Sequence, residues 1–182
     1  DSFTFDTLAN QNFTATPTVP RANIAVFSGF ERPIFNGGSD SFATIALGAT
    51  SAPAFIIRNN GTLPLSNISM TVTGAPPGEF FVELAPATTL APNAVTVATV
   101  RIKPTTTGVR SATVLIHSDD PNEDPFVVQL SGLVVSIEVT NTADSGPGSL
   151  RQAISNSALT EGYDTILFHP SLSGQTITVS NE

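Results

Sequence analysis

The sequence contains no cysteine and no tryptophan, and Lys103 is its only lysine. Without cysteine, a chain has no disulfide, no thiolate metal ligand and no cysteine nucleophile. Positive charge is scarce as well, because 7 Lys and Arg residues stand against 15 Asp and Glu residues, which gives a formal net charge of −8. Nucleic acid and anionic membrane surfaces are therefore excluded as expected partners. No stretch approaches the roughly 18 apolar residues of a transmembrane helix.

What the chain does contain is enough apolar material for a core. Of its 182 residues, 40% are hydrophobic and only 12% are charged. This length fits one large domain, or one domain and part of a second. Low charge with abundant Thr, Ser and Asn is common in secreted β-proteins, so we expect an extracellular or bacterial cell-surface location. The chain begins at Asp1 without a signal segment and is expected to be a processed mature chain or a defined fragment.

Most of the chain up to about residue 140 predicts short strands joined by turns. Apolar and polar residues alternate in the stretches 55–58, 112–117 and 126–130, with Gly, Pro and Asn between such stretches. This period of two predicts strands with one face in a core, and hence an all-β sandwich. The alternation changes phase between Val95 and Ile102, which predicts either a β-bulge or a strand covered on both faces.

Three blocks of sequence resemble the choice-of-anchor D domain, an immunoglobulin-like relative of Hydin-type modules. They read F-I-I-R-N-N-G-T-L-P-L at 55–65, L-A-P at 90–92 followed by G-V-R-S-A-T-V at 108–114, and H-S-D-D-P at 117–121. The resemblance implies an immunoglobulin-like β-sandwich over about residues 21–134. Members of that family are mostly repeated spacers or interaction modules, and the resemblance implies no catalytic residues.

The one convincing helix follows a turn-forming stretch at 144–149. Ser149 is a good N-cap, and Gln152 three residues later completes a capping box. Leu150 and Ile154 then lie on the apolar face of the helix, together with Ala153 and Ala158. After the helix, residues 164–168 and 175–179 are predicted to form two strands.

This C-terminal part resembles the entry to a right-handed parallel β-helix. The residues are V-T-N-T-A-D at 139–144 and G-S-L-R-Q-A-I at 148–154, where surface-protein families carry C-S-L-R-E-A-I. The chain departs from that motif at Gly148 and Gln152. The resemblance implies that residues 135–182 are the cap and first rung of a β-helix, with Leu150 and Ile154 covering its apolar interior.

A single rung cannot bury its own apolar surface, since a solenoid needs roughly three or more repeats. Three arrangements would cover it. The rung lies on its own sandwich, it stacks on another subunit, or further rungs follow in a longer protein.

The first twenty residues form a separate segment. Phe3 and Phe5 alternate with polar residues, and Pro17 and Pro20 punctuate the end of the segment. Three interpretations are open: an extra edge strand of its own sandwich, a strand donated to a neighbouring subunit by β-augmentation, or a disordered tail. In the donated strand, the apolar anchors are Phe3, Phe5, Leu8 and Phe13.

Candidate chemistry is sparse. The densest group of oxygen ligands is Asp119, Asp120, Asn122, Glu123 and Asp124. Such ligands suit Ca²⁺, but the same residue types favour a hairpin turn, which is the preferred interpretation. His117 and His169 are the only imidazoles and make a poor zinc site. No G-x-S-x-G nucleophile elbow is present.

The sequence therefore predicts a non-catalytic extracellular structural protein without a cofactor. Its parts are an extended arm (1–20), an immunoglobulin-like sandwich (21–134) and a β-helix cap with its first rung (135–182). Its expected partners are copies of itself or neighbouring surface-protein modules. The expected assembly is a bacterial surface structure, for example a filament joined by strand donation and rung stacking. The alternative is an adhesin or carbohydrate-binding spacer from a larger anchored protein, and an enzymatic β-helix ranks third.

Overall fold

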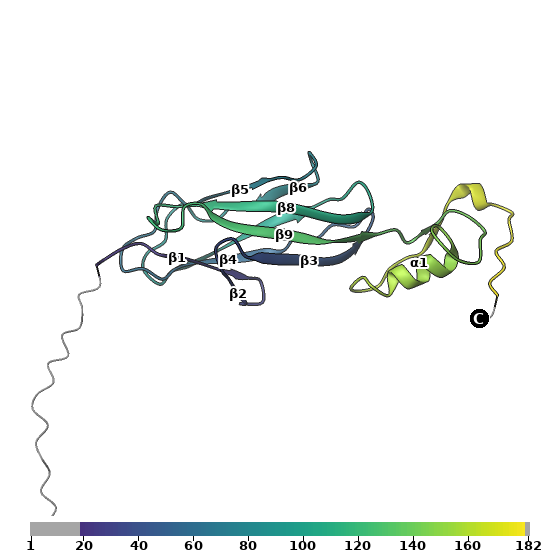
Figure 1. Cartoon of the computed structure of the whole chain (residues 1–182), viewed down its shortest axis with the longest axis horizontal. Coiled ribbons are helices and arrows are strands. Elements are labelled where there is room, and N and C mark those ends of the chain that lie inside the picture. The colour runs from purple at the N-terminus through teal and green to yellow at the C-terminus, as the bar shows by residue number, and fades with distance from the viewer. Residues whose placement is uncertain (1–18, 181–182) are drawn as a thin grey trace, which may run out of the picture.

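The computed structural model describes residues 19–180, which form two β-sheets packed face to face and a smaller C-terminal segment (Figure 1). The first sheet has the order β2-β1-β4-β7-β6. Its strands are β1 (Ile24–Ser28), β2 (Pro33–Ile34), β4 (Ala54–Asn59), β6 (Phe80–Leu84) and β7 (Val95–Ile102). The second sheet has the order β3-β9-β8-β5. Its strands are β3 (Ser39–Ala46), β5 (Ser69–Thr73), β8 (Gly108–His117) and β9 (Phe126–Val135).

This strand order is that of an immunoglobulin-like sandwich. Strands β1, β4, β7 and β6 correspond to the ABED sheet, and β5, β8 and β9 to the CFG sheet. The chain crosses between sheets early, because β3 pairs in parallel with β9 instead of extending the sheet of β1. The prediction of an all-β, immunoglobulin-like sandwich is confirmed.

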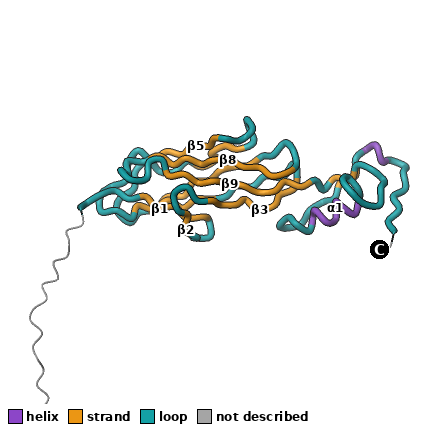
Figure 2. Tube along the Cα trace, viewed as in Figure 1, coloured by secondary structure: helices purple, strands orange, loops and turns teal. Residues whose placement is uncertain are grey.

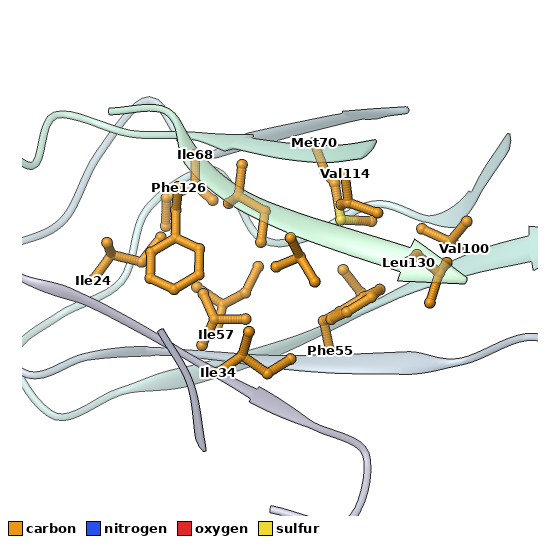
Figure 3. Packing of buried hydrophobic residues seen from close by; sticks show 14 of the residues in the cluster. Ile24, Ile34, Phe55, Ile57, Ile68, Met70, Val100, Val114, Phe126 and Leu130 are labelled. Atoms are coloured by element: carbon orange, nitrogen blue, oxygen red, sulfur yellow. The ribbon is translucent and has the colours of Figure 1, made fainter. Parts of the chain in front are cut away.

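The core lies between the two sheets and is filled by the residues that alternate in the sequence (Figure 3). Phe55 and Ile57 on β4 are fully buried, while Ile56 between them points outward. Val114 and Leu130 close the core from the second sheet. The alternation of apolar residues therefore predicted the buried faces of these strands.

The phase change in β7 has a different origin from the one predicted. Val100 and Ile102 face the core with no exposed surface, whereas Val95 and Val97 lie on the outer face and are 51% and 44% exposed. The register shift at this edge lies in β6, between Val82 and Leu84. β7 itself keeps a regular alternation, and its outer face carries Val95 and Val97 followed by Thr99 and Arg101.

Beyond the sandwich, β9 runs to Val135 and is followed by a two-stranded parallel sheet of β10 (Glu138–Val139) and β11 (Leu167–Phe168). Helix α1 (Leu150–Ser157) and the 3-10 helix η1 (Pro170–Leu172) complete this segment (Figure 2). Its small core consists of Val139, Ala153 and Leu172, with Leu150, Ile166 and Ile177 packed against it. A β-helix is not shown by these elements.

Two strand predictions in this segment were too long. Only Leu167–Phe168 of the stretch 164–168 is a strand, and residues 175–179 form none. The reason is that a strand needs a neighbouring backbone to bond, and residues 176–179 make no backbone hydrogen bond within the described part of the chain.

The two ends of the described chain lie far apart. Residue 19 is at one end of the longest axis, and the C-terminal segment is at the other (Figure 1). The four expected anchors Phe3, Phe5, Leu8 and Phe13 lie outside the described residues. In the described part of the chain, no helix is long and apolar enough to cross a membrane.

Candidate functional site

The acidic turn between β8 and β9 uses its carboxylates to hold backbone N–H groups. The Asp119 carboxylate accepts a hydrogen bond from the Ser66 N–H at 2.7 Å. The Asp120 side chain, which is 1% exposed, accepts from the N–H groups of Ile24 (2.8 Å) and Asn122 (2.9 Å). Asp120 thereby ties the start of β1 to this turn.

These contacts favour the turn over the calcium site proposed for Asp119, Asp120, Asn122, Glu123 and Asp124. Within residues 19–180, no group of three or more His, Cys, Asp or Glu residues is placed to hold a metal ion. Partial burial, followed by the charge of Asp120, raises the pKa of Glu123.

His117 lies near a carboxylate and a serine, the residue types of a catalytic triad. Its Nδ1 lies 3.0 Å from the Asp124 carboxylate, and Ser69 is its cross-strand partner in β5. However, no hydrogen bond joins the Ser69 hydroxyl to His117 among the described residues. His169 is engaged elsewhere, with its Nδ1 2.8 Å from the Ser171 hydroxyl. The two histidines therefore do not meet in one site.

The buried carboxylate of Glu79 connects the start of β6 to the loop between β7 and β8 and to β8 itself. Glu79 is 1% exposed and accepts hydrogen bonds from the N–H (2.8 Å) and hydroxyl (2.6 Å) of Thr105. Its second oxygen lies 3.4 Å from the Arg110 guanidinium. The hydrogen bonds from Thr105, with the charge of Arg110, hold the pKa of Glu79 below its usual value.

We expect Glu79→Gln to lower stability by about 2 kcal/mol at pH 7, since it removes a charge-assisted pair from a buried site. Because the folded pKa is depressed, this contribution is present above the unfolded pKa near 4.3 and is lost as the pH falls through the folded value. Urea unfolding at pH 7, 5 and 3 should show the wild type and the variant converging on acidification. A gap that is independent of pH would contradict the role given to the ionised carboxylate.

The start of α1 is organised largely as its sequence indicated. The Ser149 hydroxyl accepts a hydrogen bond from the Gln152 N–H at 3.2 Å. The reciprocal half of the capping box is missing, because the Gln152 amide donates to Asn156 and the Ser149 N–H donates to Gly146. Ser149 is thus the N-cap. The Gln152 side chain instead bonds to Asn156, one turn further along the helix.

Gly148, where the chain departs from the C-S-L-R-E-A-I motif, is required by its surroundings. Its φ is +80°, and a Cβ placed on it would lie 2.2 Å from the Thr140 hydroxyl. Any other residue would be strained by the positive φ and would have to displace the side chains of Thr140 and Asn141.

The helix covers the small core on a different face from the one expected. Ala153 is buried and Leu150 packs against the same cluster, but Ile154 is 53% exposed. The expectation that Leu150 and Ile154 together cover an apolar interior therefore holds only for Leu150. Ile154 lies at the margin because no described residue reaches over it.

The candidate functional site is the open end of this C-terminal segment. An apolar hollow of about 470 Å³ lies between β11, η1 and the extended chain that follows. Its apolar lining consists of Leu150, Phe168, Pro170, Leu172 and Ile177. Phe168 and Leu167 of β11 are 53% and 59% exposed. An exposed aromatic ring beside a hollow is a typical docking feature.

The extended chain beside the hollow is fixed at both ends and open between them. At the near end, the Gln175 N–H donates to Leu172 and its amide donates to Ser171. At the far end, Asp144 and Arg151 hold Ser180, with the Arg151 guanidinium 2.9 Å from Asp144 and 2.7 Å from the Ser180 carbonyl. Residues 176–179 make no hydrogen bond within the described part of the chain.

The Asp144–Arg151–Ser180 contact was not predicted. Hydrogen bonds from Ser180 and Arg151 lower the pKa of Asp144, so this carboxylate is ionised at neutral pH. Nothing in the sequence indicated the pairing, because Ser180 is 36 residues from Asp144, with α1, β11 and η1 between them. The exposed position of Phe168 was also not predicted.

Neither a protein-family model nor a curated protein sequence matches the chain. Among solved structures, a Porphyromonas gingivalis W83 protein of unknown function is 18% identical, with a TM-score of 0.49, 67% of this chain covered and 51% of that one. This chain thus spans about half the length of that protein. The ASH/PapD-like domain 7 of human CEP192 is 15% identical, with a TM-score of 0.46 and coverages of 70% and 96%. The CARDB domain of PF1109 from Pyrococcus furiosus is 13% identical, with a TM-score of 0.44 and coverages of 64% and 98%.

The immunoglobulin-like assignment rests on the strand order of this chain itself and not on these neighbours.

Proposed function

We propose that the chain is a non-catalytic structural module of an extracellular, bacterial surface assembly, joined head to tail with copies of itself. The observation that carries this proposal is the extended segment 176–179, which makes no hydrogen bond within the described residues and lies next to the exposed Phe168. An unpaired backbone beside an apolar hollow is a template for another strand.

The overall shape supports a linear assembly. Residue 19 and the open end lie at opposite ends of the longest axis (Figure 1). A contact between two such different ends is heterologous, and a heterologous contact that does not close into a ring produces a fibre. Choice-of-anchor D domains, which the sandwich sequence resembles, are mostly repeated spacers and fit such a role.

The test is to measure the oligomeric state of the purified 182-residue chain as a function of its concentration. Sedimentation velocity and negative-stain electron microscopy should show oligomers that lengthen with concentration into regular fibres. A single small monodisperse species at every concentration would contradict self-assembly.

We further expect that removal of residues 1–20 abolishes assembly. This segment carries the four apolar anchors Phe3, Phe5, Leu8 and Phe13 and precedes every strand of the sandwich. The shortened chain should sediment as a monomer and retain the unfolding midpoint of the sandwich. Unchanged polymer in the shortened chain would show that the arm is not a donated strand.

A second candidate is an adhesin or carbohydrate-binding spacer. Two aromatic rings on the β1–β2 side of the sandwich favour it, since Phe30 is 98% exposed and Phe35 is 80% exposed. Exposed aromatic faces are surfaces on which sugar rings stack. Glycan-array binding that is lost in Phe30→Ala would support this function. If no glycan is bound and the protein is monomeric, only the spacer role would remain.

A further inference from the structure

We infer that the apolar hollow at the C-terminal end binds residues 1–18 of a second copy of the chain, which adds as a strand beside β11 and residues 176–179. This inference rests on the proposed head-to-tail assembly and gives that assembly a specific docking site. The occupant is a segment of the same protein, so no other partner is needed.

The hollow offers what an added strand needs, namely unpaired backbone groups and an apolar floor. Within residues 19–180, β11 is paired only with β10, so its other edge has no described strand beside it. Residues 176–179 supply backbone donors and acceptors without a partner in the described part of the chain. The hollow between them supplies the apolar floor, to which Phe168 contributes a half-exposed ring. Backbone hydrogen bonds would provide affinity, and the hollow would select alternate apolar side chains.

The N-terminal segment matches this receptor in pattern and position. Phe3 and Phe5 alternate with polar residues, so both rings fall on one side of an extended strand. The described chain, which begins directly after this segment, starts at the end of the long axis opposite the C-terminal segment that holds the hollow (Figure 1). A copy placed head to tail therefore brings its own open end toward this arm.

The sandwich is a poorer receptor for the same strand. Its core is closed by its own strands, with Phe55, Val100 and Leu130 fully buried (Figure 3). Three of its sheet edges are less suited: β3 and β6 each contain a register shift, and β2, which is as short as β11, borders a smaller hollow of about 240 Å³. The fourth edge, β5 (Ser69–Thr73), is regular and is the competing site.

The first experiment places a charge in the hollow. We expect Phe168→Asp to raise the concentration at which oligomers form by at least about tenfold, because a buried Phe ring contributes about 1.5–3 kcal/mol to association. The matched control is Phe30→Asp, at a ring that is 98% exposed on the sandwich. The control should assemble as the wild type does, and thermal unfolding of both variants should show an intact sandwich.

The second experiment locates the arm by cross-linking. Because the chain has no cysteine, single cysteines can be introduced without background. Thr4→Cys in one copy is mixed with either Thr176→Cys or Thr71→Cys in another, and a short bis-maleimide is added. Cross-linked dimers should form with Thr176→Cys and not with Thr71→Cys on β5.

The outcomes separate this inference from the proposed function. Oligomers that survive Phe168→Asp, or that cross-link through Thr71→Cys, overturn the docking site while head-to-tail assembly stands. A chain carrying both Thr4→Cys and Thr176→Cys that cross-links within a monomer overturns the second copy as occupant. A monomeric wild type at every concentration overturns both.

Discussion

Asn59→Ala should cost about 3 to 5 kcal/mol of folding free energy, because it leaves several buried backbone groups without partners. The Asn59 side chain is fully buried at the end of β4. Its amide donates to the carbonyls of Leu63 (2.8 Å) and Leu90 (3.0 Å), and its oxygen accepts from the Gly61 N–H (2.9 Å). One side chain thus joins two loops to a central strand.

The neighbouring Asn60→Ala is the matched control, because the Asn60 side chain is exposed. We expect urea unfolding to show a change within about 0.5 kcal/mol for this variant. The isosteric Asn59→Asp, which keeps the acceptor and loses both donors, should remain strongly destabilised. If Asn59→Ala were as mild as Asn60→Ala, the hydrogen bonds of the buried amide would not contribute to stability.

The loop that Asn59 holds also requires a glycine at position 61. A Cβ on Gly61 would lie 2.3 Å from the Arg21 carbonyl and 2.6 Å from the Asn23 nitrogen. The chain entering β1 therefore packs directly against the loop after β4. Asn59 and Gly61 act together to fix the entry of the first strand.

Phe55→Ala should lower the free energy of unfolding by a similar amount, about 3 to 5 kcal/mol, since it removes a fully buried ring from the centre of the sandwich. The surrounding side chains come from both sheets and cannot collapse onto the space without moving a strand (Figure 3). The measurement is the free energy of unfolding in urea, with the slope as a check on the denatured state.

Ile56→Ala, one residue further along β4, is the control for Phe55→Ala. Ile56 pairs with Phe27 and Val97 on the outer face of the sheet. Its loss should cost under about 1.5 kcal/mol, because its side chain is only partly buried. Equal effects at 55 and 56 would mean that the assigned inward face of β4 is wrong.

The sequence alone determined the sandwich and the start of the helix. Alternating apolar residues set the inward faces of β4, β8 and β9 because side chains of a strand point to opposite sides in turn. Ser149 was recognisable as an N-cap because capping depends on a few adjacent residues. These features are local, so a single sequence carries them.

The tertiary structure decided what depends on residues distant in sequence. The outward position of Val95 and Val97 in β7 follows from which face meets the second sheet. The acidic turn binds the N–H groups of Ile24 and Ser66, which are 96 and 53 residues away from their carboxylates. No sequence pattern encodes such contacts.

The same distinction separates the candidate site from the segment that we propose binds there. The apolar arm is visible in the sequence as alternating phenylalanines, and the stretch 175–179 has the composition of a strand. Only the folded chain places the latter beside a hollow, pinned by Asp144 and Arg151, with its backbone unpaired in the described residues. Composition determines whether a segment can form a strand, but a strand forms only where the fold brings a second backbone alongside.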